Sequence, residues 1–452
     1  MMDVTSRLRS IVRSGSAKPV RELTYEPDTG GYEAAVDLTR VGEILGGRTV
    51  DTPFGACLVV DRRYESDRWH GGVQIGDCEV GDCSVLGILD PSLPVHLDGE
   101  GARGDTGRRT IFIDLETTGL SGGAGTVAFL VGCGFFDVGA FQVRQFLLTS
   151  HSAERALLHA VAQFFEGADL IVTYNGKTFD VPVMETRWLF HRIQMPLDGV
   201  AHFDMLHPAR RLWKARELGG SLVRELDGMD GGCRLTTLER SLFEVSRVGD
   251  VDGFEIPGRF FHFLRNGDPR PLEPVLEHNR LDLVSLAAVM GRAMRLAREG
   301  HASCRDAGEA LALGRIFERA GMHDRAEACY RRATDSTSAH VKGEALYRIG
   351  VKYRRDRRFA DAAAIWREVL VLTEGRRVSR SGPILVLRQY AAEALAVHHE
   401  HRERDFYGAR ELALFALEDA RPSRAEAARY RLARLDRKIQ KKKDARQLSV
   451  LF

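Results

Sequence analysis

The sequence lacks a long hydrophobic run, a marked excess of charge of one sign, and a regular cysteine framework. Its longest apolar run, Val127 to Phe136, covers ten residues, about half of what a membrane-spanning helix needs. Arginines interrupt the N-terminal segment, which therefore has no apolar core of a secretion signal. Seven cysteines without a pairing pattern fit a reducing compartment. These absences predict a cytoplasmic protein with no transmembrane segment.

Several catalytic and metal-binding motifs are also missing. The glycines from Gly119 to Gly125 are not followed by the Gly-Lys-Ser or Gly-Lys-Thr of a phosphate-binding loop, and no serine-centred nucleophile elbow is visible. Cys78 and Cys83 have no second pair in metal-ligand register, so a structural role is favoured over zinc. The sequence therefore shows no motif of a P-loop nucleotide-binding protein, of a serine hydrolase or of a zinc site.

Charge is balanced over the whole chain, with 65 basic and 63 acidic residues and a net charge of +2. The distribution is less even, because Arg421 to Arg446 contains eleven Lys and Arg against three Asp and Glu. Such a run is often a solvated helix face, and it can also hold phosphates. Both interpretations stay open at this point.

The composition is that of a globular protein, with 44% hydrophobic and 28% charged residues in 452 positions, which leaves room for about three domains. Residues 1–104 form a region of unknown role, and a Gly-rich stretch at 97–107 suggests a boundary. In 105–299 we expect a mixed α/β sheet with flanking helices. The expected strands are 110–116, 127–136 and 141–148, in an antiparallel meander, and 170–174, and the expected helices are 153–165, 181–192, 208–216 and 271–297.

Residues 300–420 are rich in Ala and Arg and read as helical. A pattern of small and large side chains recurs there after 36 positions: Leu313, Gly314, Phe317, Ala326, Tyr330 and Ala333 return as Ile349, Gly350, Tyr353, Ala362, Trp366 and Val369. This resembles the tetratricopeptide repeat, with a degenerate third unit around residues 391–416. The alternative is an ordinary helical bundle. Either would serve as a docking surface for a protein partner.

Two carboxylates stand out in the strand IFIDLETTGL. Because side chains alternate along a strand, Asp114 and Glu116 point to one face while Ile113 and Leu115 face apolar packing. Such a pair repels itself unless cations neutralise it, and hard oxygen ligands suit Mg²⁺ or Mn²⁺. Acidic residues also cap turns, so this motif alone is weak evidence.

Two further acidic positions follow along the chain. Asp180, in YNGKTFD, lies near the start of an expected helix, where a carboxylate also serves as an N-terminal cap. His278 and Asp282, in EHNRLD, are four residues apart and hence on one helical face. In isolation they would more often form a surface pair, and Asp204 is better explained as a helix cap than as a metal ligand.

Together and in this order, DLETTGL, YNGKTFD and EHNRLD resemble the DEDD superfamily of 3′-5′ exonucleases, which have a ribonuclease-H-like fold. The text ETTGLSGGAGTVAFLVG is most similar to its bacterial YprB-like branch. The resemblance implies that two Mg²⁺ or Mn²⁺ ions are held by Asp114, Glu116, Asp180 and Asp282, and that His278 orients or deprotonates the attacking water. His278 stands at the spacing where members with a catalytic tyrosine place that residue.

This resemblance predicts a metal-dependent exonuclease acting on single-stranded or frayed nucleic acid. Candidates for substrate contacts are Thr117, Asn175, Lys177, Arg210 and Arg211. Two alternatives remain open: a non-catalytic nucleic-acid-binding adaptor that recruits partners through its repeats, and an endonuclease on the same fold. The presence of all four carboxylates weighs against an adaptor.

The basic tail, 421–452, ends in Gln447, Leu448, Ser449, Val450, Leu451 and Phe452. Large apolar side chains there should either fold back on the helices or insert into a partner's pocket. The segment resembles the clamp-binding peptides of bacterial DNA polymerases and repair proteins. That resemblance implies that Gln447, Leu448, Leu451 and Phe452 contact the bacterial sliding clamp, which favours DNA repair and a DNA substrate.

Overall fold

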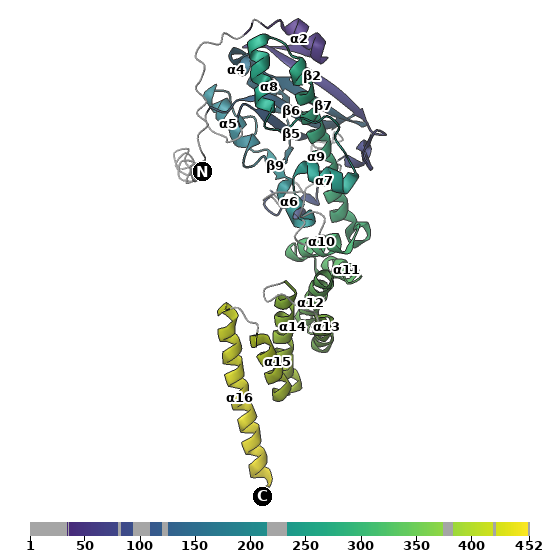
Figure 1. Cartoon of the computed structure of the whole chain (residues 1–452), viewed down its shortest axis with the longest axis vertical. Coiled ribbons are helices and arrows are strands. Elements are labelled where there is room, and N and C mark those ends of the chain that lie inside the picture. Colours follow the sequence, from purple (N-terminus) through teal and green to yellow (C-terminus); the bar gives the residue numbers. More distant parts are fainter. Residues whose placement is uncertain are drawn as a thin grey trace.

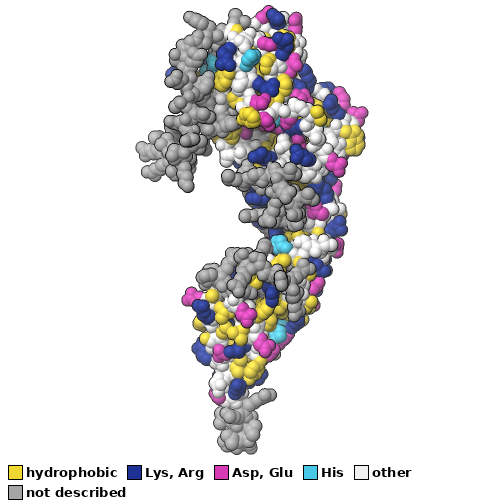
Figure 2. All heavy atoms as spheres, viewed as in Figure 1, with side chains coloured by type: hydrophobic (Ala, Val, Ile, Leu, Met, Phe, Trp, Pro, Cys, Tyr) yellow, Lys and Arg dark blue, Asp and Glu magenta, His cyan; other side chains and the backbone are white. Residues whose placement is uncertain are grey.

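The computed structural model describes residues 34, 36–79, 83–93, 109–119, 125–214, 233–373, 383–418 and 422–450, without the side chains of 383, 422–423 and 446–450. The molecule is elongated: a mixed sheet with its helices occupies one end, and a run of helices leads away from it (Figure 1). Basic and acidic side chains are interspersed over both parts on the face shown in Figure 2. Among the described helices we find none with the length and apolarity needed to cross a membrane.

The described strands form one large sheet and one small hairpin. The large sheet contains β1 (Arg48–Thr52), β2 (Gly55–Glu65), β5 (Thr110–Thr117), β6 (Ala128–Asp137), β7 (Ala140–Leu147), β8 (Leu170–Thr173) and β9 (Ala201–Asp204), in the order β1-β2-β7-β6-β5-β8-β9. Strands β5, β6 and β7 pair antiparallel, so the predicted meander is confirmed. Strands β5, β8 and β9 pair parallel. The hairpin joins β3 (Trp69–His70) to β4 (Val73–Gln74).

The sheet begins earlier in the chain than the predicted boundary at residue 105. Strand β2 pairs with β7 over eight positions, from Leu58 opposite Leu147 to Glu65 opposite Ala140, and β1 pairs with β2. The boundary therefore does not separate two structural bodies. A local pattern cannot reveal this, because the pairing joins segments about 80 residues apart in sequence.

Helices cover both faces of the sheet. They are α2 (Leu38–Leu45), α3 (Leu86–Leu89), α4 (Glu154–Phe165), α5 (Asp180–Phe190), α6 (Leu206–Trp213), α7 (Leu235–Phe243), α8 (Ile256–Asn266) and α9 (Glu273–Glu299), with short 3-10 turns η1 (Ile75–Cys78), η3 (His151–Ala153), η5 (Arg270–Leu272) and η6 (Gly300–Ser303). Ile113 and Leu115 pack with α4, α5 and α8, whereas Phe112 packs on the opposite side with α6, α7 and α9. The predicted alternation along β5 is thus confirmed, as are the helices expected at 153–165, 181–192, 208–216 and 271–297.

The described part of the chain after residue 300 consists of helices joined by short turns and loops. It contains α10 (Ala307–Arg319), α11 (His323–Ala333), α12 (Ala339–Arg355), α13 (Phe359–Thr373), α14 (Pro383–His398), the π turn η7 (His399–Glu403), α15 (Phe406–Glu418) and α16 (Pro422–Val450). Gly314 faces Tyr330, and one repeat later Gly350 faces Trp366. A Cβ at either glycine would lie only 2.5 Å or 2.3 Å from the aromatic ring. The 36-residue pattern therefore marks the same close helix contact twice.

The basic C-terminal run is part of α16, and some of its charge has a structural use. Arg431, Arg434 and Lys438 bind the carboxylate of Glu400, whose side chain is fully buried. Burial alone would raise the pKa of Glu400, but the hydrogen bonds and charges of Arg434 and Lys438 lower it to about 2. Gln447 and Leu448 lie within α16 but their side chains are outside the described ones, and Leu451 and Phe452 lie outside the described residues.

The seven cysteines are all buried and free. Cys78 and Cys83 both belong to the apolar core beneath the sheet. Burial raises the pKa of the Cys78 thiol to about 12, so this side chain stays protonated near neutrality. The packing therefore supports a structural role for Cys78 and Cys83 over zinc binding.

Candidate active site

The end of β5 presents Asp114 and Glu116 side by side on one face of the strand. Both are half-buried, while Ile113 and Leu115 between them are buried on the other face. Because β8 runs parallel to β5, the two strands end at the same edge of the sheet. The loop after β8 therefore brings the start of α5 to these carboxylates.

Asp180 is the first residue of α5 and is buried. Its Oδ1 accepts a hydrogen bond from the Leu115 main-chain N–H at 3.2 Å, which ties the helix start to β5. The loop before it is shaped by the fully buried Asp204, which accepts hydrogen bonds from the N–H groups of Asn175 and Lys177. Asp204 also accepts from the Leu206 N–H at the start of α6, the capping role expected for it.

Helix α9 crosses the same edge and contributes Asn279, which sequence reasoning missed. Its side-chain amide donates to Asp114 Oδ2 at 2.8 Å and to the Asp114 main-chain oxygen at 3.1 Å. Gln145 on β7 fixes the amide by donating to Asn279 Oδ1 at 2.8 Å. Gly132, the β6 partner of Asp114, makes room: a Cβ there would lie 2.2 Å from Asn279 Oδ1. A glycine opposite an acidic strand residue is the signal that could have pointed to this contact.

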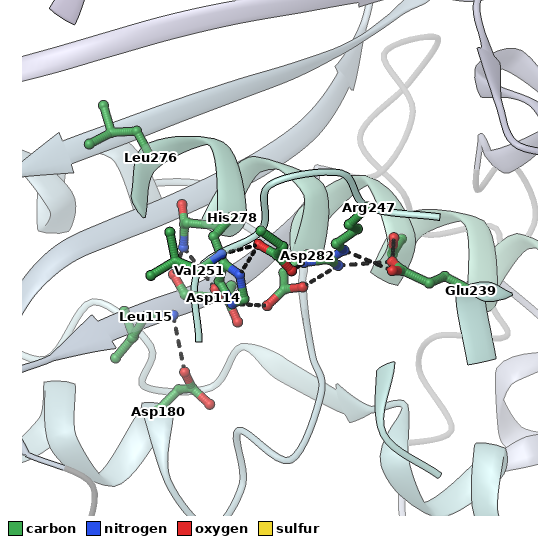
Figure 3. A network of polar contacts seen from close by, with 12 residues as sticks. Asp114, Leu115, Asp180, Glu239, Arg247, Val251, Leu276, His278 and Asp282 are labelled. Atoms are coloured by element: carbon green, nitrogen blue, oxygen red, sulfur yellow. Dashed lines mark hydrogen bonds and ion pairs between the residues drawn. The ribbon is translucent and has the colours of Figure 1, made fainter. Parts of the chain in front are cut away.

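One turn of α9 holds His278 and Asp282 (Figure 3). His278 Nδ1 lies 2.6 Å from Asp250 Oδ1, and Nε2 lies 3.5 Å from Asp282 Oδ2. Burial alone would raise the pKa of Asp250, but the hydrogen bond to His278 and the charges of His278 and Arg247 lower it below its ordinary value. The ionised Asp250 therefore fixes the imidazole ring by accepting from Nδ1.

The loop between α7 and α8 supplies two further groups, Arg247 and Asp250. Arg247 donates to Asp282 Oδ1 at 2.5 Å and forms an ion pair with the buried Glu239 of α7 (Figure 3). Neither residue was predicted from the sequence, because the segment VSRVGDVDGF matches no motif and its charges resemble those of an ordinary surface loop.

The carboxylates influence one another strongly. Loss of water raises the pKa of Asp114 and of Glu116 well above their ordinary values, and the charges of Asp282 and Asp180 raise both further. Loss of water also raises the pKa of Asp180 to about 7, against the opposing effect of its main-chain hydrogen bonds. Within the described part of the chain, Asp114, Glu116 and Asp180 form no ion pair with a basic side chain. Negative charge is thus concentrated at a site that water reaches only in part.

This donor set fits a hard divalent cation. Carboxylate oxygens are the ligands that Mg²⁺ and Mn²⁺ prefer, and a cation would relieve the repulsion that raises these pKa values. Among the described residues, no group of three or more His, Cys, Asp or Glu side chains lies close enough together to hold a metal ion as it stands. The residues that bind a cation would therefore have to move closer together around it.

The five residues predicted to contact the substrate differ in their neighbours and exposure. Thr117 donates its hydroxyl to the Gly119 carbonyl at 2.8 Å, and Asn175 adopts a left-handed turn with φ of 69°. Lys177 pairs with Asp90 at 3.2 Å, and Arg211 donates to the Leu89 carbonyl at 2.7 Å, so both contact the C-terminal end of α3. Arg210 is exposed.

Comparison with known proteins agrees with this architecture. Residues 111–294, which include all four carboxylates, match the model of the RNase_H superfamily. Over 389 aligned residues the chain is 30% identical to the uncharacterized protein YprB of Bacillus subtilis (strain 168). The alignment covers 84% of this chain and 86% of that protein. The chain belongs to the YprB family. Its sheet and flanking helices are RNase H-like, and membership in that superfamily suggests a nuclease.

Proposed function

We propose that this YprB-family protein is a metal-dependent 3′-5′ exonuclease of the DEDD type, which hydrolyses phosphodiester bonds of single-stranded or frayed nucleic acid. The observation that supports this proposal most strongly is the cluster of four carboxylates that β5, α5 and α9 contribute: Asp114, Glu116, Asp180 and Asp282. Burial and repulsion raise the pKa values of three of them, which destabilises the fold unless a cation shares the site. The strand-end position leaves Asp114 and Glu116 half-exposed to a substrate.

The four carboxylates would hold two Mg²⁺ or Mn²⁺ ions, which supply charge neutralisation and an activated water when bound. His278 would take the proton of the attacking water at Nε2. Asp250 supports this by accepting from Nδ1, which leaves Nε2 free of its proton and stabilises the imidazolium that forms. Asn279 would keep the Asp114 carboxylate in one orientation through its bond to Oδ2.

The test is digestion of end-labelled single strands of DNA and RNA by the purified full chain, with Mn²⁺ or Mg²⁺ against a chelator. We expect shortening from the 3′ end that requires metal and is abolished by Asp114→Asn. The amide keeps an oxygen to accept from Asn279, so the variant should fold. Full activity in Asp114→Asn would contradict the proposed site. Cleavage of circular single strands would indicate an endonuclease, and binding without any cleavage an adaptor.

The helices from α10 to α15 supply the second part of the proposal. We infer that α10–α11 and α12–α13 are tetratricopeptide-like units, supported by the repeated Gly–aromatic contact, and that they dock a protein partner. The C-terminal segment is proposed to bind a bacterial sliding clamp through Gln447, Leu448, Leu451 and Phe452. A binding assay with the clamp should detect the full chain but not a chain truncated after Arg446. Equal binding by both, or binding by neither, would contradict a role for the peptide and remove the support for a DNA substrate.

A further inference from the structure

Arg247 forms an ion pair with Asp282, one of the four residues of the carboxylate cluster. Its side chain is only 5% exposed, and its guanidinium contacts three carboxylates. It pairs with Glu239 at 2.7 Å and 2.8 Å, with Asp282 Oδ1 at 2.5 Å and with Asp250 at 3.3 Å (Figure 3). One positive charge therefore joins α7, α9 and the loop between α7 and α8.

The guanidinium is held from behind by a buried anchor. Glu239 is 2% exposed, and both of its oxygens bind Arg247 in a two-pronged contact. The same carboxylate accepts from the Ser285 hydroxyl on α9, which in turn lies 2.9 Å from His70 Nε2. Because Glu239 is tied on both sides, Arg247 cannot swing away from Asp282 without leaving a buried carboxylate unpaired.

This arrangement divides the cluster into two parts. Asp282 has a cation on Oδ1, whereas Asp114, Glu116 and Asp180 have no basic partner in the described segments. A divalent ion that binds all four residues must approach Asp282 beside an existing positive charge. Two cations on one carboxylate repel each other, and in a partly buried site this repulsion is large compared with thermal energy.

We propose that Arg247 is a built-in counter-cation of the carboxylate cluster, which keeps Asp282 paired before metal binds and thereby weakens metal binding. The inference rests on the proposed function, since it concerns the same site. Arg247 acts through Asp282 and is a positioning residue. It stabilises the fold without metal, and it makes metal binding weaker than the four carboxylates alone would allow, so that further ligands such as the phosphates of the substrate would strengthen it.

The test compares Mn²⁺ binding to the full-length wild type and to Arg247→Met by isothermal titration calorimetry without nucleic acid. Removing the charge should tighten Mn²⁺ binding by about tenfold or more. The midpoint of thermal unfolding in chelator should fall, and Mn²⁺ should raise it by more than in the wild type. Arg247→Lys, which keeps the charge, should bind Mn²⁺ within about threefold of the wild type.

Arg187→Met is the matched control. Arg187 is also buried, at 8% exposure of its side chain, and pairs with Glu154 at 2.5 Å and 2.6 Å. Its loss should lower the thermal midpoint without changing the affinity for Mn²⁺. A general effect of removing a buried guanidinium would instead appear in both variants and would overturn the proposal.

Three results distinguish this inference from the proposed function. Unchanged or weaker Mn²⁺ binding by folded Arg247→Met, with measurable binding by the wild type, overturns the counter-cation alone. If neither protein binds Mn²⁺, the proposed metal site and the inference both fail. If Arg247→Met is unfolded in chelator, Mn²⁺ must restore its circular dichroism spectrum, and failure to do so overturns the inference.

Discussion

Neutralising Asp180 should stabilise the metal-free protein, and the effect should depend on pH in a defined direction. Burial raises the pKa of this carboxyl to about 7 from an ordinary value of 3.8. Asp180→Asn removes the charge and keeps an oxygen to accept from the Leu115 N–H. The variant therefore tests the electrostatic cost of the site without removing its main hydrogen bond.

The size of the effect follows from the shift in pKa. A raised folded-state pKa means that the folded protein binds the proton more tightly, so stability is greatest below the unfolded pKa and is lost as pH rises from about 4 to about 7. A difference of about 3 units corresponds to about 4 kcal/mol. At pH 8 the variant should gain up to about 4 kcal/mol in free energy of unfolding, and about 2 kcal/mol at pH 5, where the wild-type residue is mostly protonated.

Urea unfolding in chelator at pH 5 and pH 8 measures this directly. Asp61→Asn, which neutralises a partly exposed carboxylate on β2 outside the cluster, is the control and should keep the pH dependence of the wild type. Saturating Mn²⁺ should remove much of the advantage of Asp180→Asn, because a bound cation offsets the same charge. Equal stability of wild type and Asp180→Asn at pH 8 would refute the electrostatic reasoning.

Three further predictions concern other residues. His278→Ala should lower the rate of hydrolysis by roughly 10² to 10⁴ and flatten the acidic limb of the pH-rate profile; a smaller loss with an unchanged profile would assign His278 to packing. Gly132→Ala places a methyl group 2.2 Å from Asn279 Oδ1 and should lower the free energy of unfolding in urea by about 1 to 3 kcal/mol. The double variant Gly132→Ala, Asn279→Ala should recover part of this loss. Gly350→Ala, whose Cβ would lie 2.3 Å from the Trp366 ring, should lower the thermal midpoint but leave hydrolysis at 25 °C within about twofold of the wild type.

Local patterns were enough for the parts of the fold that depend on neighbours in sequence. The alternation of apolar and acidic residues around Asp114 was enough to predict strand β5 and which side chains lie on each of its faces, because adjacent side chains of a strand point to opposite sides. A helical run of apolar residues predicted α9, but its start was placed two residues too early: Pro271 lies in the turn η5, and Pro274 is the proline in the first turn of α9. Strands β1 and β2 could not be placed in the same way, since their position depends on pairing with β7.

The candidate site shows the same limit. Asp114, Glu116, Asp180 and Asp282 stand in recognisable motifs, and the structure brings them to one sheet edge. Their supporting residues have no such motif. Asn279 directly follows His278, so helical spacing assigns it to another face. Because α9 packs against both β5 and β6, Asn279 nevertheless donates to Asp114. Arg247 contacts Asp282 across 35 residues of sequence, a pairing that only the folded loop creates.

Helix α9 joins the site to the helical region. Its first half carries His278 and Asp282, and ten residues beyond Asp282, about 15 Å along the axis, Arg292 donates to Glu309 of α10 at 2.6 Å. Trp213 at the end of α6 donates to the other Glu309 oxygen at 2.8 Å, and the Glu309 side chain is fully buried. Separating α10 from α9 and α6 would remove the Arg292 and Trp213 contacts of this buried carboxylate, so the junction favours one fixed arrangement. Under the proposed function, a partner docked on these helices would therefore stand at a set distance and direction from the carboxylates.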